Sequence, residues 1–384
     1  MLWKFIFQVI PVLAWCFALM FGVWPLKLRR TAFLAFAAAL AVCFGKFAFF
    51  ALAGGDAFVP DLPPGVIWTY GGLYGAAMFF AAFAFAARLL DLPFALARRP
   101  VTVRTKRVRA VALALLAAAV ATWGMYEGVR MPDVTRVEIA WDELPPSFDG
   151  YRIVHLSDLH CSTAARRGRI ERIVARVNAL DADLVAITGD FVDGRVADRG
   201  HDLAPLADLK ARDGVVGCTG NHEAYWEWPA WWDRFHRWKV SILSEGAPRV
   251  IRRGGDALAV GGLTDPAFRG HRAPPSPARD AFADAPANAF RILLFHRPLT
   301  AEIGAAAADV RLQLSGHTHG GAFPVIHWLM ARANEGHVRG LYEFAPGRYL
   351  YNSPGTGQWA GFPLRLFNPA EITEITLRRR RRDA

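Results

Sequence analysis

The stretch 310-VRLQLSGHTHGG-321 joins a short apolar run to two histidines, His317 and His319, that stand one residue apart. A run of this length, rich in apolar residues and closed by glycine, predicts a buried strand. Glycine adopts backbone conformations that other residues avoid, so a tight turn can follow at Gly316, Gly320 and Gly321. One His-x-His pair is weak evidence, and its meaning depends on what ends the other strands.

Similar runs, each ending in polar residues or glycine, recur through the second half of the chain. They read YRIVHLSDLH (151–160), DLVAITGD (183–190), GVVGCTGNHE (214–223), ALAVGGLTD (257–265), FRILLFHRP (290–298), RYLYNSPGTG (348–357) and EITEITL (371–377). Between the first two, apolar residues recur three or four positions apart, as on one helix face: Ile170, Ile173, Val174, Val177 and Leu180. Strand–helix–strand order predicts α/β layers, with two sheets sandwiched between flanking helices.

Five of these runs end in residues whose side chains can bind a metal ion or transfer a proton. In chain order they are Asp158 and His160, then Asp190, then Asn221, His222 and Glu223, then His296, and last His317 and His319. Ligands of α/β sheets gather at the carboxyl ends of strands, so we expect these side chains to meet. Their types suit two divalent ions that share a carboxylate, and a His-x-His turn can reach two ions about 3.5–4 Å apart. Nitrogen and oxygen ligands without cysteine suit Mn, Fe or Zn.

Charge counting indicates the reaction. Two dications carry four positive charges, of which Asp158 and Asp190 would cancel two and a bridging hydroxide one more. The net positive site that remains suits a phosphate anion, and the metals would activate the hydroxide for attack on phosphorus. His222 could protonate the leaving oxygen. Glu223 could orient that imidazole, or it could be a cap or a surface carboxylate.

The motifs DLH, GD, GNHE, the isolated His296 and GHTHGG occur in the order that resembles the calcineurin-like metallophosphoesterases, over about residues 150–377. The resemblance implies a four-layer α/β/β/α sandwich with a dimetal centre. It implies that one ion is held by Asp158, His160, Asp190 and His319, and the other by Asp190, Asn221, His296 and His317.

The ending FPLRLFNPAEITEITL (362–377) and the apolar leader look most similar to the YkuE/YaeI-type branch, which includes membrane-associated phosphodiesterases. Some relatives there hydrolyse the pyrophosphate of UDP-2,3-diacylglucosamine in lipid A synthesis, so a lipid-linked substrate is implied. The chain departs from the branch at Ala322, where Gln is usual. The Trp-rich stretch 225–238 either packs into the core or rests at a membrane interface.

The first 126 residues are dominated by Ala, Phe, Leu and Trp. They contain four apolar stretches, at about 2–24, 32–53, 66–87 and 110–126. A helix needs about 20 apolar residues to cross a bilayer, and only the fourth stretch is short. We therefore expect a bundle of about four transmembrane helices, in which Lys46 extends to the interface.

Basic loops set the orientation of such a bundle. Lys27, Arg29 and Arg30 follow the first stretch, and seven Lys or Arg residues lie within 88–109, whereas loop 54–65 has none. We expect an integral protein of a bacterial inner membrane with its catalytic domain outside. If 110–126 did not cross, the domain would face the cytoplasm, where UDP-2,3-diacylglucosamine is made. Otherwise a phospholipid headgroup or envelope phosphodiester fits better.

The expected organisation is a transmembrane region (1–126), a linker with a leading strand (127–149), a catalytic domain (150–377) and a basic tail (378–384). The tail is either a charged disordered end or a site of attraction to anionic lipids. The four cysteines form no C-x-x-C motif and no disulfide framework. No nucleic-acid reader motif or basic–aromatic platform occurs, so we expect no nucleic-acid partner.

The leading hypothesis is a dimetal phosphodiesterase or pyrophosphohydrolase that acts on a lipid-linked or envelope substrate. A phosphomonoesterase is an alternative within the same chemistry. A non-catalytic, membrane-anchored metal-binding module is another, although the full ligand set and His222 argue against it. A transporter is disfavoured because the spans hold no paired charges beyond Lys46. No H-x-H-x-D-H occurs, which disfavours a metallo-β-lactamase-type hydrolase. The oligomeric state stays open.

Overall fold

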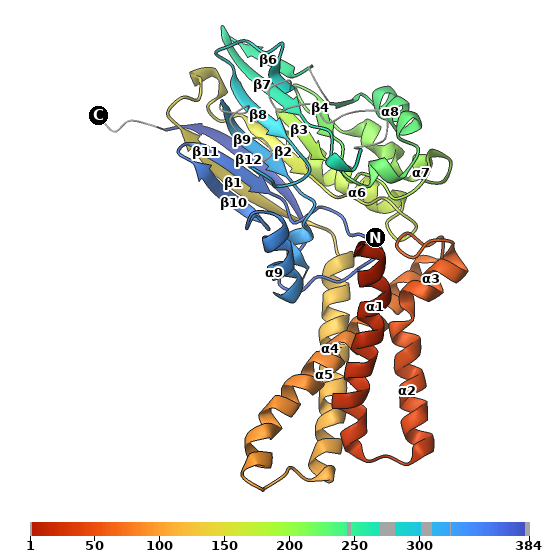
Figure 1. Cartoon of the computed structure of the whole chain (residues 1–384). Coiled ribbons are helices and arrows are strands. Elements are labelled where there is room, and N and C mark those ends of the chain that lie inside the picture. The colour runs from red at the N-terminus through yellow and green to blue at the C-terminus, as the bar shows by residue number, and fades with distance from the viewer. Residues whose placement is uncertain (1, 244–246, 269–280, 301–308, 323, 381–384) are drawn as a thin grey trace. The chain divides into compact units, whose positions relative to one another are not determined.

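The computed structural model describes residues 2–243, 247–268, 281–300, 309–322 and 324–380. The chain forms two compact units (Figure 1). A helical unit comprises Met1–Val129 and Ala360–Leu366, and an α/β unit comprises Arg130–Trp359 and Phe367–Ala384. The short segment Ala360–Leu366 thus belongs with the helices, although it falls inside the range 150–377 expected for the α/β domain. Of the expected basic tail, 381–384 lie outside the described residues.

Among the described residues, the helical unit contains five α-helices, a π-helical turn and a 3-10 turn at Trp24–Leu26. They are α1 (Leu2–Phe17) with the turn η1 (Ala18–Val23), α2 (Arg30–Phe44), α3 (Lys46–Gly54), α4 (Pro64–Leu96) and α5 (Val103–Val129). Among the described residues, three stretches are long and apolar enough to span a membrane, and the bent pair α2 and α3 makes a fourth if it is one span. The stretch expected to be shortest is therefore part of a 27-residue helix. The break falls instead in the second stretch, at a 58° bend.

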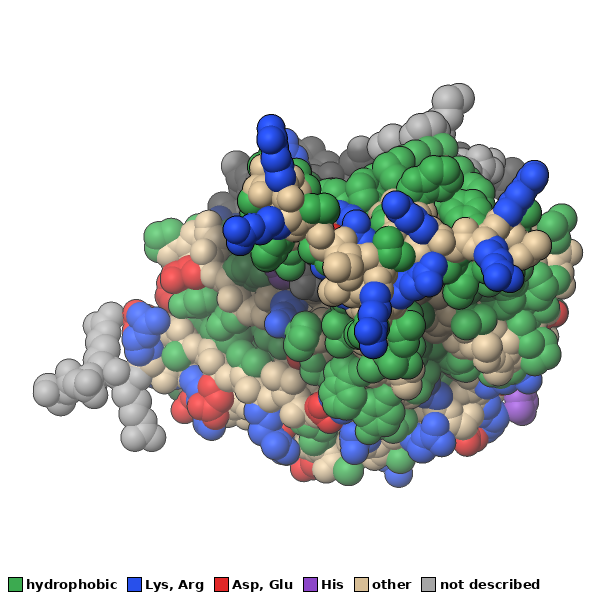
Figure 2. All heavy atoms as spheres, turned by 90° about the horizontal axis from the view of Figure 1, so that it is seen from below, with side chains coloured by type: hydrophobic (Ala, Val, Ile, Leu, Met, Phe, Trp, Pro, Cys, Tyr) green, Lys and Arg blue, Asp and Glu red, His purple; other side chains and the backbone are tan. Residues whose placement is uncertain are grey.

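The two basic loops meet at one end of the helical unit. Arg107 donates from its Nε to the carbonyl of Leu26 (3.0 Å) and from Nη2 to that of Lys27 (3.1 Å). Arg88 and Arg109 both pair with the Asp91 carboxylate. Lys and Arg side chains project from the face seen in Figure 2. Basic residues gathered at one end of the helices are what the positive-inside rule requires.

Lys46 does not extend to an interface, so that expectation is wrong. Its side chain is fully buried, and its ammonium group donates to the carbonyl of Gly361 and lies over the ring of Phe47. The reason is the returning segment, Ala360–Leu366, which packs among the helices and supplies an acceptor there. The N–H of Arg365 also donates to the carbonyl of Gly124 (3.0 Å).

In the part of the chain that the structure describes, the α/β unit is built on two six-stranded sheets. The first has the order β1 (Asp133–Trp141), β12 (Glu371–Arg379), β2 (Arg152–Leu156), β3 (Leu184–Thr188), β4 (Val215–Cys218) and β5 (Val240–Ile242). The second has the order β10 (Gly340–Ala345), β11 (Arg348–Asn352), β9 (Val310–Ser315), β8 (Phe290–Leu294), β7 (Asp256–Gly262) and β6 (Arg249–Arg253). Strands β2 to β5 run parallel, as do β7, β8, β9 and β11.

The central strands are buried on both faces, which explains their apolar runs. Ile153 of β2 points into the core between the sheets, whereas Val154 points to the outer face. That face is covered by α6 (Arg167–Asn178), the helix predicted from its spacing, together with α7 (Val196–Leu203) and α8 (Trp228–Arg237). The outer face of the second sheet is covered in part by residues 281–289. The expected α/β sandwich is confirmed.

The Trp-rich stretch serves mainly as core. In α8, Trp231 and Phe235 are fully buried, and the indole N–H of Trp231 donates to the carbonyl of Gly194 (3.0 Å). Trp232 is 39% exposed, and Tyr225, which precedes the helix, is 62% exposed. Core packing therefore accounts for the helix, and Tyr225 needs a separate explanation.

The fit of the returning segment generates a prediction. A Cβ at Gly124 would lie 2.8 Å from Leu364 Cγ, whereas one at Gly65 would have nothing within 4 Å. We expect Gly124→Leu to destabilise the helical unit by about 1–3 kcal/mol, the usual cost of overpacking. The measurement is the melting temperature of the detergent-solubilised protein. Gly65→Leu is the control, and equal melting temperatures for the two variants would contradict the packing described.

Candidate metal centre

The candidate ligands lie on turns that follow β2, β3, β4, β8 and β9. Five of them have positive φ, an uncommon conformation for residues other than glycine. They are Asp158 (53°), His160 (44°), Asp190 (52°), His317 (71°) and His319 (48°). Such conformations cost free energy and persist where the surrounding structure requires them, often at functional sites. These turns bring the five side chains together in one region of the molecule.

Two glycines allow the turns to approach one another. A Cβ at Gly316 would lie 2.3 Å from Asp158 Oδ2, and one at Gly220 would lie 2.2 Å from Asp190 Oδ1. Neither distance is compatible with any other residue. The glycines before His317 and Asn221 are therefore required by the closeness of two carboxylates, in addition to any freedom of the backbone.

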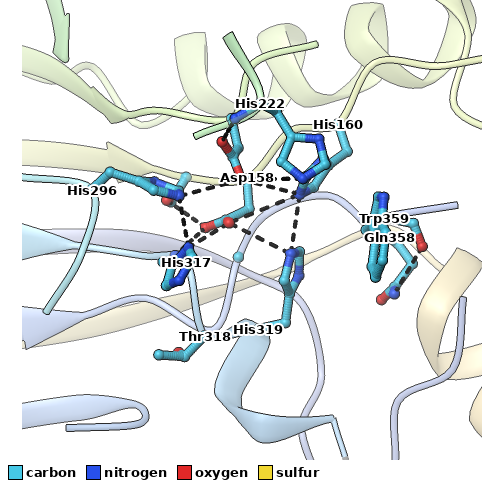
Figure 3. A network of polar contacts seen from close by, with 12 residues as sticks. Asp158, His160, His222, His296, His317, Thr318, His319, Gln358 and Trp359 are labelled. Carbon is cyan, nitrogen blue, oxygen red and sulfur yellow. Dashed lines mark hydrogen bonds and ion pairs between the residues drawn. The ribbon is translucent and has the colours of Figure 1, made fainter. Parts of the chain in front are cut away.

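One cluster contains Asp158, His160 and His319 (Figure 3). The Nε2 atoms of His160 and His319 are 3.0 Å apart, and His319 Nε2 is 3.5 Å from Asp158 Oδ1. Ligands bound at about 2.0–2.1 Å to one ion lie roughly 3.0–3.4 Å from each other by simple geometry. These separations therefore suit side chains that share a cation.

A second cluster contains Asp190, His296 and His317. His296 Nε2 is 3.3 Å from Asp190 Oδ2 and 3.2 Å from His317 Nδ1. The same Asp190 oxygen is 3.7 Å from His160 Nε2 in the first cluster. Asp190 thus stands between the two clusters, where a bridging carboxylate would be needed.

Asn221 supplies an independent test of the fit. Its Oδ1 is buried and has no hydrogen-bond partner among the residues that the structure describes. Its Nδ2 donates to the Tyr225 hydroxyl (3.4 Å), and the next N–H, of His222, donates to Asp190 Oδ1 (2.9 Å). A buried carbonyl oxygen without a donor is costly, and a cation would satisfy it. The predicted ligands fit the divalent ions expected of them.

The residue that sequence reasoning missed is Asp193. It is fully buried and accepts from Nδ1 of His222 (2.5 Å), and it also faces Nδ1 of His160 (3.2 Å). The contacts direct Nε2 of both rings toward the centre, as carboxylates do for metal-bound histidines. A second carboxylate three residues after Asp190, in the same loop, was the available signal.

Glu223 serves the backbone instead of His222. Its carboxylate accepts from the N–H groups of Asp190 (3.0 Å), Phe191 (2.8 Å) and Gly220 (2.7 Å). Burial and the nearby Asp190 raise the pKa of Glu223 to about 7. Glu223 is fully buried, so it is not a surface carboxylate. Of the roles considered for this residue, the structure supports the cap, which ties the Asp190 turn to the Asn221 turn.

The centre attracts positive charge. Burial alone would lower the pKa of His296, but Asp190 and Asp158 outweigh burial and raise it to about 10. Asp190 and Asp193 likewise overcome burial and raise the pKa of His222 to about 9. Burial and the neighbouring His296 lower the pKa of His317 to about 3, so that imidazole keeps its lone pair.

A sixth strand end, after β11, also reaches the centre. The N–H of Thr356 donates to the carbonyl of Ser157 (2.7 Å), and that of Gly357 to the carbonyl of Asp158 (3.0 Å). This holds Gln358 and Trp359 beside the histidines (Figure 3). The run RYLYNSPGTG was recognised as a strand, but it carried no candidate residue. Ala322, at the departure from the branch pattern, closes the turn with an N–H bond to the His319 carbonyl (3.2 Å).

Comparisons with known proteins agree with this geometry. The family model of the calcineurin-like phosphoesterases matches residues 151–321. A transmembrane protein with metallophosphoesterase domain from Danio rerio is 34% identical over 278 residues, or 70% of this chain and 63% of the relative. An uncharacterized metallophosphoesterase of Helicobacter pylori is 31% identical and covers 66% of each chain. The uncharacterized metallophosphoesterase YkuE of Bacillus subtilis is 27% identical over 69% of this chain and 94% of its own.

The matched part spans 54–63% of the length of the first three curated relatives. The range matched by the family model, residues 151–321, nevertheless contains every predicted ligand and the turns that carry the two clusters. The chain contains a calcineurin-like phosphoesterase domain at residues 151–321.

Proposed function

We propose that this protein is a membrane-anchored dimetal phosphodiesterase that hydrolyses a lipid-linked or cell-envelope phosphodiester. The observation that supports it most is the position of Asp190 between two ligand clusters, 3.7 Å from His160 Nε2 and 3.3 Å from His296 Nε2. Cleavage of a pyrophosphate, as in UDP-2,3-diacylglucosamine, would use the same residues.

Each predicted ligand has a role in this proposal. Asp158, His160 and His319 would hold one ion, Asn221, His296 and His317 the other, and Asp190 both. Divalent ions such as Mn, Fe or Zn, when bound there, activate water and offset negative charge on a phosphoryl group. The protein's part is to keep seven side chains in place, and the buried, hydrogen-bonded turns suit that task.

His222 is the proposed proton donor. Its Nδ1 faces Asp193, and its Nε2 is directed toward the centre, 4.0 Å from Asp190 Oδ2. With Asp193 fixing the ring, the Nε2 proton can pass to the oxygen of the departing alcohol. The phosphorus–oxygen bond to that alcohol breaks, and the oxygen of water is retained on phosphorus.

The catalytic domain is proposed to face away from the cytoplasm. The two basic loops lie at one end of the helical unit, tied by the bonds from Arg107 to Leu26 and Lys27. α5 is 27 residues long and leads from that end to the α/β unit. Basic loops stay in the cytoplasm, so α5 would carry the following domain across a bacterial inner membrane.

Metal dependence tests the reaction. The Mn-loaded wild type should hydrolyse bis-p-nitrophenyl phosphate and lose this activity on chelation. Asp190→Asn should lower kcat/KM by more than the roughly 10–100-fold typical of residues beyond the ligands, because both clusters lose a ligand. Asp198→Asn, at an exposed carboxylate, is the control. Activity in Asp190→Asn equal to that of the control would exclude the proposal, and an inactive, metal-bound wild type would favour a non-catalytic module.

General acid catalysis by His222 has a distinct signature. His222→Asn should lower kcat for diphenyl phosphate by about 10²–10⁴-fold, since phenol needs a proton as it leaves. The loss should be much smaller for bis-p-nitrophenyl phosphate, whose leaving group is stable as an anion. Bound metal is measured alongside, and His236→Asn, on the exposed face of α8, is the control. Equal losses on both esters would assign His222 a role other than proton transfer.

The side of the membrane can be tested directly. Alkaline phosphatase, which is active only outside the cytoplasm, should be active when fused after Ala384, because α5 is proposed to cross the membrane. A fluorescent protein that folds only in the cytoplasm should stay dark at the same position. The opposite results would place the domain in the cytoplasm and would favour a nucleotide–lipid substrate.

A further inference from the structure

Two aromatic side chains stand beside the proposed proton donor and are not explained by the chemistry above. The ring of Tyr225 is centred 5.4 Å from that of His222, and the ring of Trp359 is centred 6.0 Å from it. Neither residue belongs to the metal-ligand clusters. Both rings therefore lie near His222, the group proposed to protonate the departing alcohol.

Tyr225 is held at the centre while its ring stays accessible. Its hydroxyl accepts from Asn221 Nδ2 (3.4 Å), and its N–H donates to the carbonyl of His222 (3.0 Å). The side chain is nevertheless 62% exposed. An aromatic ring fixed at a site but open to solvent is a surface on which an apolar group can rest.

Trp359 is held by the loop that precedes it. Gly357 donates to the carbonyl of Asp158, and a Cβ at Gly357 would lie 2.1 Å from the carbonyl oxygen of Leu159. Only glycine allows this loop to lie against the ligand turn, two residues before Trp359. Trp359 is thus held by a loop whose backbone is bonded to the ligand turn.

We propose that Tyr225 and Trp359 form the leaving-group subsite and that it receives the apolar alcohol of the diester, an inference that rests on the proposed function. His222 Nε2 marks where the departing oxygen must lie, so the carbon atoms attached to that oxygen come within reach of the two rings. Water adds to phosphorus, the bond to the apolar alcohol breaks, and that oxygen takes the His222 proton. The phosphate stays on the other alcohol.

Two esters that release the same alcohol test the assignment on the full-length, Mn-loaded protein. They are methyl p-nitrophenyl phosphate and phenyl p-nitrophenyl phosphate, which differ only in the group that phosphorus retains. Trp359→Ala and Tyr225→Ala should each lower kcat/KM about two- to tenfold on both esters alike, the expected loss of one aromatic contact. Trp359→Phe should keep most of the activity. Trp232→Ala, a partly exposed tryptophan of α8, is the matched control.

The outcomes separate the subsite from the reaction. A loss confined to the phenyl ester would assign the rings to the retained alcohol and overturn the inference, as would no loss on either ester. Bound Mn and the melting temperature distinguish a folding defect, and Tyr225→Ala, at an exposed side chain, decides the matter if Trp359→Ala is unstable. A wild type that binds Mn but cleaves neither ester would instead overturn the proposed function.

Discussion

The constraint on which the site depends is the burial of negative charge at Asp190. This carboxylate is nearly inaccessible to solvent, and Asp158 beside it is wholly so. An ionised carboxylate is stable in such a place only if positive charge or hydrogen bonds compensate it. Here backbone N–H groups and imidazoles surround both groups, and burial raises the pKa of Asp158. The left-handed conformations of five candidate ligands, which lie on three turns, follow from the same need, because they bring these side chains together at a buried centre.

The convergence of the candidate ligands could be predicted in part from the sequence because each ends a strand. Parallel strands of one sheet deliver their carboxyl ends to the same edge, so the order of the runs already implied that Asp158 and Asp190 would meet. The α6 helix could likewise be predicted, since Ile170, Ile173 and Val177 all face the first sheet. Periodicity is a local property, and in these segments local preference and tertiary packing agree.

The features that could not be predicted depend on the path of the chain in space. Asp193 is one carboxylate among many, and only the meeting of two loops brings it to His160 and His222. The burial of Lys46 requires a carbonyl from residue 361, more than 300 positions away. Nothing in the spacing of 360–366 distinguishes it from a surface loop, because its partners are glycines of α4 and α5 that read as ordinary helix positions.

The loop from Asn352 to Phe367 therefore has two attachments of different kinds. At Gly357 it is bonded to the backbone of a metal-ligand turn, and at Gly361 to a buried ammonium group of the helical unit. Only Gln358, Trp359 and Ala360 lie between these points. So short a segment has little conformational freedom. The loop therefore leaves Trp359 few backbone conformations, which suits a ring that lies beside His222, with ring centroids 6.0 Å apart.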